Sequence, residues 1–263
     1  MTKIAKGLKT IILSGGLGTR LSEETDVKPK PMVEIGGYPI IWHIMNIYST
    51  YGHNEFYVAL GYKGEQIKRY FMEYNLLQND LNVNLQTGTT TATGNAKHQN
   101  WDINLMNTGQ DTQTGGRILK LQDYISSGTF MATYGDGVSD INIQNLIQFH
   151  KSHGKLATIT AVRPPSRFGT LQFEDDKVIS FAEKPQIDEG WINGGFFVLE
   201  PQVLDYIDND STIFERDPLE KLAQDGQLMA YKHQGFWQPM DTLRELRLLR
   251  NMWDTNQAPW KTW

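Results

Sequence analysis

The chain has 263 residues, of which 39% are hydrophobic and 11% aromatic, a composition typical of a folded protein with a sizeable core. Its net charge of −5 argues against a general nucleic-acid binder, and the absence of cysteine excludes disulfides, zinc–thiolate sites and a thiol nucleophile. No apolar run approaches the ~20 residues of a membrane span. We therefore expect a cytoplasmic protein that binds neither nucleic acid nor a membrane.

The first predicted element is a buried strand that ends in a glycine-rich loop. Residues 11–13 are apolar, and three glycines and two cations follow them: Gly15, Gly16, Gly18, Arg20 and Lys30. Backbone N–H groups in such a loop can converge on phosphate oxygens. An ordinary turn that needs glycine is the alternative. A dinucleotide fingerprint is excluded because Leu21 replaces its third glycine, and a P-loop because its Gly-Lys-Ser/Thr ending is missing.

Residues 39–77 predict a parallel α/β unit. A helical pattern begins at Pro39 and ends at Gly52, an alternating strand covers 55–60, and a second helix covers 64–77. This order requires a parallel sheet with right-handed crossovers. We therefore predict an α/β fold with a mostly parallel, Rossmann-like central sheet flanked by helices.

Residues 79–100 interrupt the alternation with a run of Asn, Thr, Gln and Gly. Such a stretch is either a mobile excursion that serves as a lid or an oligomer contact, or a disordered surface loop. The pattern then resumes with strands at 102–107 and 130–134 and a helix at 117–125 between them.

The second half of the chain predicts further strands and helices without a linker. A helix that Asp140 would cap runs to His153, and the last helix begins at a capping box of Thr242 and Glu245. Between them lie predicted strands at 157–162, 178–181, 192–199 and 228–232 and helices at 201–207 and 214–224. We predict one domain over 1–263, with the C-terminal third folded back against the rest.

Two aspartates, Asp136 and Asp241, are candidate metal ligands. Asp136 stands between two glycines after the strand at 130–134, and Asp241 follows an aromatic and proline-rich turn. Ligands in open parallel sheets bind at the carboxyl ends of the strands. Two carboxylates are what Mg²⁺ usually takes from a protein when nucleotide phosphates supply other ligands. A turn aspartate and a helix-capping aspartate are the alternatives.

Polar residues with neighbouring glycine or proline predict a second half of the site. Lys184 could bind a phosphate, and Glu183 could accept from sugar hydroxyls, although an exposed strand end explains this pair equally well. Asn193 precedes two glycines that allow a polyhydroxyl ligand to approach. Trp237 could stack on a sugar or a base, or belong to the core. The six scattered histidines are interpreted as structural.

These motifs together resemble the signature of the sugar-1-phosphate nucleotidyltransferases. Gly-Gly-x-Gly-Thr-Arg-Leu at 15–21 and Lys-Pro at 30–31 are followed in order by Tyr-Gly-Asp-Gly at 134–137, Glu-Lys-Pro at 183–185, Asn-Gly-Gly at 193–195 and Trp-Gln-Pro-Met-Asp at 237–241. The stretches at 22–25, 236–242 and 258–263 are most similar to the glucose-1-phosphate cytidylyltransferase branch.

The resemblance implies that the phosphate of α-D-glucose 1-phosphate attacks the α-phosphorus of CTP, giving CDP-glucose and pyrophosphate without a covalent enzyme intermediate. It also implies Mg²⁺ as cofactor and a homo-oligomer as the assembly. The alternatives are the same reaction with another sugar 1-phosphate or with UTP or dTTP, and a non-catalytic protein that binds a nucleotide sugar.

The resemblance also implies roles by position. Nucleotide binding would involve Leu13, Gly15, Gly16, Gly18, Thr19, Arg20, Lys30, Thr114, Gly115, Gly116 and Asp136. Catalysis would rest on Arg20, Lys30, Asp136 and Asp241, and the two aspartates would ligate Mg²⁺. A smaller C-terminal part would bind the sugar phosphate through Gly169, Glu183, Lys184, Asn193 and Trp237.

Overall fold

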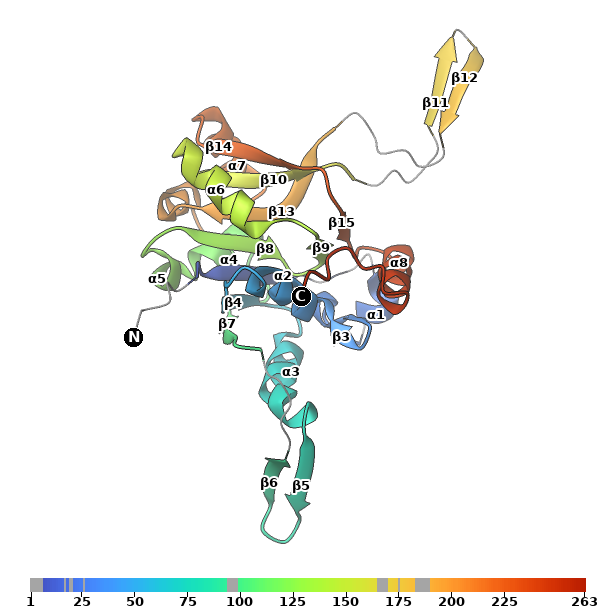
Figure 1. The fold of residues 1–263 in the computed structure, drawn as a ribbon. Helices are drawn as coiled ribbons and strands as arrows, with labels where there is room; N and C mark the ends of the chain where they lie inside the picture. Colours follow the sequence, from blue (N-terminus) through green and yellow to red (C-terminus); the bar gives the residue numbers. More distant parts are fainter. Residues whose placement is uncertain are drawn as a thin grey trace.

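A seven-stranded sheet runs through the protein (Figure 1). The computed structural model describes residues 7–16, 18, 21–25, 27–93, 99–164, 170–174, 176–182 and 190–263. In sheet order the strands are β14 (Leu228–His233), β10 (Ala157–Val162), β13 (Ile192–Leu199), β8 (Phe130–Tyr134), β1 (Thr10–Ser14), β4 (Glu55–Leu60) and β7 (Asp102–Asn107). Neighbouring strands pair in parallel except where β13 meets β8 and β10, which confirms the predicted mostly parallel sheet.

Both faces of the sheet are covered by helices. Along β1, Ile12 faces a core that includes side chains of α2 (Ile40–Ser49), α6 (Ile143–His153) and α8 (Leu243–Asp254). Ile11 and Leu13 face a second core with α4 (Thr114–Leu119), α5 (Gln122–Ile125) and α7 (Asp217–Gln224). Because successive side chains of a strand point to opposite faces, a strand covered on both sides is apolar throughout. This explains why residues 11–13 form a continuous apolar run.

The register of the sheet brings three chain segments to one edge. Leu13 pairs with Tyr134, so β1 and β8 end side by side, with the glycine loop next to Gly135 and Asp136. Because β13 is antiparallel to β8, its first residues lie at this same edge, with Phe196 opposite Thr133. The edge therefore combines the carboxyl ends of β1 and β8 with the start of β13.

A two-stranded pair outside the main sheet joins distant parts of the chain. β9 (Gly137–Ser139) pairs antiparallel with β15 (Trp237–Pro239), and the N–H of Met240 donates to the carbonyl of Asp136 over 2.8 Å. The predicted capping box is confirmed, because Thr242 and Glu245 cap the start of α8 reciprocally. The sequence predicted only a turn at β15.

Some predicted elements differ in the structure. The predicted helix at 117–125 is two short helices, α4 and α5, and the one at 201–207 is a 3₁₀ helix over Pro201–Tyr206. Helix α7 begins at Asp217, where Pro218 suits the first turn. The expected Asp140 cap is wrong: Asn142 caps α6, and Asp140 instead pairs with His233 at 2.9 Å.

The remaining described elements are short or project from the body. The short ones near the N-terminal loop are α1 (Ser22–Thr25), the 3₁₀ helix η2 (Lys30–Met32), β2 (Glu34–Ile35) and β3 (Tyr38–Pro39). A hairpin of β11 (Thr170–Glu174) and β12 (Lys177–Ala182) contains the strand predicted at 178–181.

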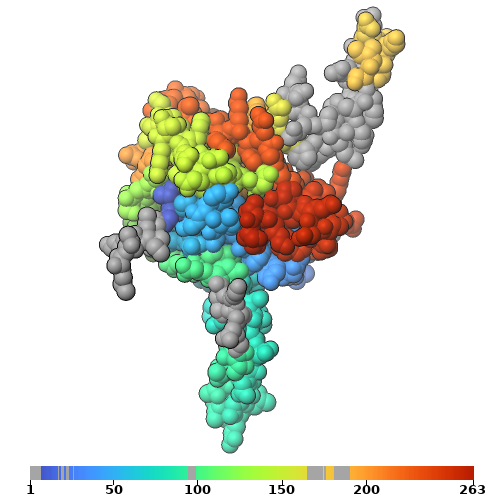
Figure 2. Space-filling view, in the orientation of Figure 1, coloured from blue at the N-terminus to red at the C-terminus, as the bar shows by residue number. Residues whose placement is uncertain are grey.

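The hairpin in the polar stretch at 79–100 belongs to an arm of the protein. Helix α3 (Gly64–Leu77) continues into a hairpin of β5 (Asp80–Asn84) and β6 (Thr89–Thr93), whose strand residues are all exposed. Figures 1 and 2 show this hairpin clear of the body. Its role as a lid or an oligomer contact stays a prediction, as does the single domain over 1–263. No helix in the described part of the chain has the length and apolar composition that crossing a membrane requires.

Candidate active site

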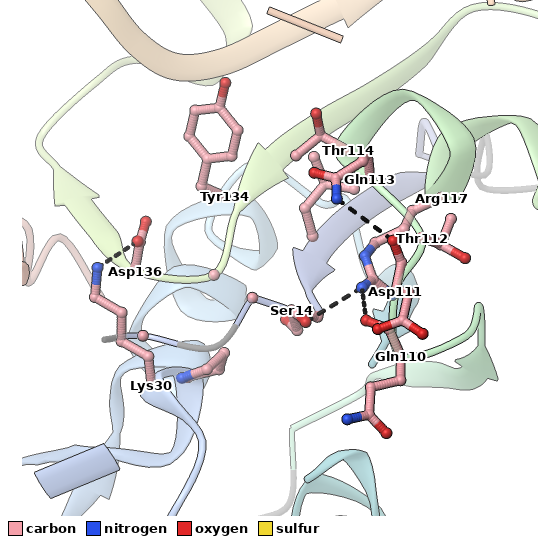
Figure 3. A pocket seen from close by; sticks show the side chains of 16 residues that line it. Ser14, Lys30, Gln110, Asp111, Thr112, Gln113, Thr114, Arg117, Tyr134 and Asp136 are labelled. Atoms are coloured by element: carbon pink, nitrogen blue, oxygen red, sulfur yellow. Dashed lines mark hydrogen bonds and ion pairs between the residues drawn. The ribbon is translucent and has the colours of Figure 1, made fainter. Parts of the chain in front are cut away.

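A cavity of about 510 Å³ lies at the carboxyl ends of β1 and β8. Figure 3 shows Lys30 and Asp136 on one side of it, Gln110 to Arg117 on the other, and Ser14 between them. The lining combines the end of β1 and its glycine loop, the start of η2, residues 110–114 before and at the start of α4, and the end of β8. The cavity is thus assembled from segments that are far apart in the sequence.

Most of the predicted nucleotide-binding residues that the structure describes line this cavity: Leu13, Gly15, Gly16, Gly18, Lys30, Thr114 and Asp136. Gly115 and Gly116 lie next to it but outside its lining. Five predicted site residues lie outside the described residues: Thr19, Arg20, Gly169, Glu183 and Lys184. Their roles stay predictions.

The two predicted metal ligands meet at one lysine. The Nζ of Lys30 lies 2.6 Å from Oδ2 of Asp136 and 2.5 Å from Oδ1 of Asp241. The β9–β15 pair sets this geometry, because Asp136 precedes β9 and Asp241 follows β15. The side chain of Lys30 is only 10% exposed. Burial alone would lower its pKa, but Asp136 and Asp241 outweigh burial and hold the pKa above its usual value, so the lysine stays charged.

The convergence of these two carboxylates fits a hard cation. Their oxygens already approach one positive centre, and carboxylate oxygen is the ligand type that Mg²⁺ prefers. Within the described ranges, no group of three or more His, Cys, Asp or Glu side chains has the arrangement of a metal site. Two protein carboxylates therefore leave several coordination positions for phosphate oxygens and water, as is usual for Mg²⁺ bound with a nucleotide.

Arg117 is a site residue to which the sequence assigned no role. Its guanidinium donates to the carbonyls of Gly15, Leu60, Gly109 and Gln110 and to the hydroxyl of Thr108, over 2.7–3.2 Å. These bonds tie the glycine loop to the loop that lines the opposite wall of the cavity. Burial lowers the pKa of Arg117. The signal available in the sequence was its place directly after Thr114, Gly115 and Gly116, which are predicted to bind the nucleotide.

The glycines around the cavity also serve close packing of the protein with itself. A Cβ on Gly15 would lie 2.0 Å from the guanidinium carbon of Arg117. A Cβ on Gly115 or Gly116 would lie 2.8 or 2.5 Å from backbone oxygens of Thr212 and Asp210. Glycine at these positions thus lets Arg117 and the segment at 209–216 approach, a requirement that the sequence alone did not reveal.

Two of the predicted sugar-phosphate residues lie together at the start of β13. Asn193 donates from Nδ2 to the hydroxyl of Tyr134 over 3.0 Å and accepts at Oδ1 from the N–H of Gly195 over 2.8 Å. The indole of Trp237 donates to the carbonyl of Gly194 over 2.7 Å. Asn193 is therefore joined through Tyr134 to the wall of the cavity.

The histidines with described contacts have structural partners. His43 is fully buried between the carbonyl of Ile35 and the indole of Trp260, and His150 bonds to Thr158 and Glu200. These contacts agree with the structural interpretation of the histidines.

Comparisons with known proteins show the family of the chain. The family model described as nucleotidyl transferase matches residues 9–246. The glucose-1-phosphate cytidylyltransferase of Salmonella typhi is 52% identical over 257 residues, which cover 97% of this chain and 100% of the relative. A probable glucose-1-phosphate cytidylyltransferase of Bacillus subtilis (strain 168) is 49% identical with the same coverage.

Among solved structures, HddC from Yersinia pseudotuberculosis has a TM-score of 0.69 and 24% identity and covers 94% of this chain and 99% of its own, a likeness that concerns the fold alone. The matched family and the relatives agree with the resemblance that the motifs carry. The chain belongs to the nucleotidyl transferase family and, within it, to the glucose-1-phosphate cytidylyltransferases.

Proposed function

We propose that this protein transfers the cytidylyl group of CTP to α-D-glucose 1-phosphate and releases pyrophosphate, with the cavity at the ends of β1 and β8 as its active site. The observation that carries this assignment is the meeting of Lys30, Asp136 and Asp241 beside the glycine loop. A phosphoryl-transfer site without a covalent intermediate needs mainly positioning and neutralisation of charge, and these groups supply both.

The nucleotide would lie across the cavity. Its phosphates would occupy the side of Lys30 and the glycine loop, where an ammonium and backbone N–H groups meet the anionic oxygens. The base would then lie against residues 110–114, whose side chains and backbone can donate to and accept from its edge. Arg117 would keep these two walls in register, because it bonds to carbonyls of both.

Asp136 and Asp241 would hold Mg²⁺, which when bound neutralises charge on the nucleotide phosphates. Lys30 is the group that now balances the two carboxylates, and its flexible side chain could donate to a phosphate oxygen instead. Asn193 and Trp237 would bind the sugar phosphate on the β13 side. Thr19, Arg20, Gly169, Glu183 and Lys184 keep their predicted roles as proposals.

A non-catalytic nucleotide-sugar binder is the rival of a different class. Such a protein does not need a lysine that bonds to two carboxylates at the side of the cavity where the phosphates would bind. Use of UTP or dTTP, or of another sugar 1-phosphate, is the nearer rival. Assembly as a homo-oligomer and a cytoplasmic location remain proposals from the sequence.

Asp136→Asn tests the proposed site. Asparagine keeps the size of the side chain but removes the charge that would balance Lys30 and hold Mg²⁺. We expect turnover to fall by about 100-fold or more, the scale of losing one strong electrostatic contact in an active site. Asp123→Asn on the exposed side of α5 is the matched control and should keep wild-type turnover. Equal turnover of Asp136→Asn and the control, with both folded by circular dichroism, would contradict the assignment.

A further inference from the structure

We propose that Glu215 is a positioning residue for this transfer, which orients the nucleotide side and the sugar-phosphate side of the active site together. The proposal rests on the proposed function, because it takes Thr114 to face the nucleotide and Asn193 to face the sugar phosphate. Neither the sequence motifs nor the family resemblance assigned Glu215 any role.

Glu215 lies behind the cavity and not in its lining. It belongs to the segment at 209–216, which precedes α7 and packs against the start of α4. The N–H groups of Gln113 and Gly115 donate to the carbonyls of Asp210 and Thr212 over 2.8 and 3.0 Å. Glu215 is half-buried, while Thr114 and Tyr134, which it contacts, both line the cavity. The carboxylate is thus placed to act through its neighbours.

One carboxylate orients two hydroxyl groups. The hydroxyl of Tyr134 donates to Oε1 of Glu215, and the hydroxyl of Thr114 donates to Oε2, each over 2.5 Å. An ionised carboxylate only accepts hydrogen bonds, and each hydroxyl has a single proton. Both protons therefore point to Glu215, and both hydroxyl oxygens must accept from their other neighbours.

The other neighbours satisfy this requirement on both sides. Thr114 Oγ1 accepts from the N–H of Phe214 over 2.9 Å, and the Tyr134 oxygen accepts from Nδ2 of Asn193 over 3.0 Å. Because Oδ1 of Asn193 accepts from the N–H of Gly195, the amide has one defined orientation. One N–H and one lone pair of Asn193 remain for a polyhydroxyl ligand. Glu215 thus orients the Tyr134 hydroxyl so that it accepts from Asn193, and this hydroxyl and the N–H of Gly195 together hold the amide.

The surroundings of Tyr134 keep this chain of bonds in place. Gly195 has a φ of +77°, and a Cβ there would lie 2.4 Å from the Tyr134 ring, so the ring packs directly on the backbone of β13. The ring also meets Phe197 edge to face, with centroids 5.8 Å apart. Burial and the charge of Glu215 raise the pKa of Tyr134 well above its usual value, so its hydroxyl keeps the proton that it donates.

Glu215→Gln tests the coupling, with Glu220→Gln on the exposed side of α7 as the matched control. The amide presents an N–H to one of the two hydroxyls and can do so in either orientation, so neither hydroxyl keeps a single fixed direction. We expect the KM for CTP and the KM for glucose 1-phosphate each to rise by about tenfold, the scale of losing a hydrogen bond to a charged group. Tyr134→Phe, which breaks only the branch to Asn193, should raise the KM for glucose 1-phosphate and leave that for CTP within about twofold. The control should match wild type.

A double-mutant cycle separates coupling from general damage. In the variant that combines Glu215→Gln with Tyr134→Phe, the KM for glucose 1-phosphate should rise no further than in Glu215→Gln alone. Glu215→Gln with both KM values equal to those of the control overturns the proposal, as does a loss of thermal stability with unchanged kinetics. If Glu215→Gln does not fold, the kinetics of Tyr134→Phe test the proposal instead. A KM for glucose 1-phosphate in Tyr134→Phe equal to that of wild type would then contradict it. A wild-type protein that releases no pyrophosphate from CTP and glucose 1-phosphate would instead contradict the proposed function itself.

Discussion

Lys30 balances two carboxylates, one from the middle of the chain and one from its C-terminal part. Asp136 lies 106 residues and Asp241 lies 211 residues beyond it, yet both bond to its ammonium. Without that ammonium, two partly buried negative charges would face each other, which is costly unless another cation replaces it. In the nucleotide-free protein, the ammonium of Lys30 therefore neutralises the two carboxylates that we propose bind Mg²⁺ together with the nucleotide.

Lys30→Met should strengthen binding of Mn²⁺, a spectroscopic substitute for Mg²⁺, to the nucleotide-free protein. Lys30 competes for the two carboxylates, and its unit charge a few ångströms away opposes a second cation. We expect the dissociation constant for Mn²⁺, measured by electron paramagnetic resonance, to fall by about tenfold or more relative to wild type. Turnover should fall at the same time, because the cation proposed for the phosphates is lost.

Lys28→Met is the control for this experiment. Lys28 lies two positions from Lys30 and pairs with Glu34 at 2.8 Å on the surface. We expect its replacement by methionine to leave Mn²⁺ binding unchanged. Weaker Mn²⁺ binding in Lys30→Met than in the control would show that the lysine supports the cation site instead of competing for it.

Single residues also show where sequence reasoning reaches its limit. The motif around Gly15 predicted a glycine loop after a buried strand, because this pattern is a local signal, and the loop lines the cavity. The guanidinium that makes glycine necessary at this position comes from Arg117, 102 residues later. Nothing local to either residue reports that contact. The sequence did not predict a role for Glu215 for the same reason, because its partners Thr114 and Tyr134 are 101 and 81 residues away.

At the scale of elements, local chemistry decided which features could be predicted. The start of α8 was predicted correctly because its capping box needs only Thr242 and Glu245, three residues apart. The three-residue strands β9 and β15 were not predicted, because they are too short to show an alternating pattern and β15 ends in proline. Yet their pairing brings Asp136 and Asp241 together, so the proposed metal site depends on an element that the sequence did not reveal.

The contact between α2 and the C-terminal segment makes stability depend on pH. Nε2 of His43 donates to the carbonyl of Ile35, and Nδ1 accepts from the indole of Trp260, so the imidazole is neutral. Burial lowers the pKa of His43 from 6.5 to about 4. Between these two values the unfolded chain binds a proton that the folded chain does not, so the free energy of unfolding falls as the pH falls from about 6.5 to 4.

His43→Gln should remove most of this contribution. From the two pKa values, His43 alone should cost about 2 kcal/mol of unfolding free energy between roughly pH 7.5 and pH 5. Urea unfolding of both proteins at the two pH values measures it: the variant is expected to be the less stable at the higher pH and to lose less on acidification. An identical loss in the variant and in wild type would contradict a neutral, buried His43.

The arm of α3, β5 and β6 has the features of an interface between copies of the chain. Leu81 and Val83 alternate along β5 and therefore share one face of the hairpin, and Leu85 follows them in the turn; they are 43%, 53% and 91% exposed. An isolated two-stranded hairpin is only marginally stable in water, so a hairpin with an exposed apolar face gains from a partner. This observation supports the proposed homo-oligomer.

Replacing Leu81, Val83 and Leu85 together by Asn should shift the protein toward smaller assemblies in size-exclusion chromatography with light scattering. The matched control carries Ser at Asn82 and Thr91, which pair with each other on the opposite face of the hairpin. We expect the control to keep the wild-type mass. An apolar-face variant with the same mass as wild type would exclude this face from the interface.

The cavity lies at the carboxyl ends of β1 and β8, and β13 begins at the same edge of the sheet. Strands β1 and β8 carry the glycine loop and Asp136, while β13, which runs antiparallel beside β8, carries Asn193. The α/β class and the mostly parallel sheet were predictable because buried strands and amphipathic helices alternate along the chain. The order in which strands of the second half join the sheet was not, since it depends on contacts between distant segments.

This arrangement predicts a reaction between two ligands held side by side, with CTP on the β1 side and glucose 1-phosphate on the β13 side. The most direct measurement is pyrophosphate release by the purified protein with Mg²⁺, with CTP, UTP and dTTP each offered with a panel of sugar 1-phosphates, and with the products identified by mass. CTP with glucose 1-phosphate should give the fastest release and yield CDP-glucose. Faster release with UTP or dTTP, or no release with any pair, would contradict the account.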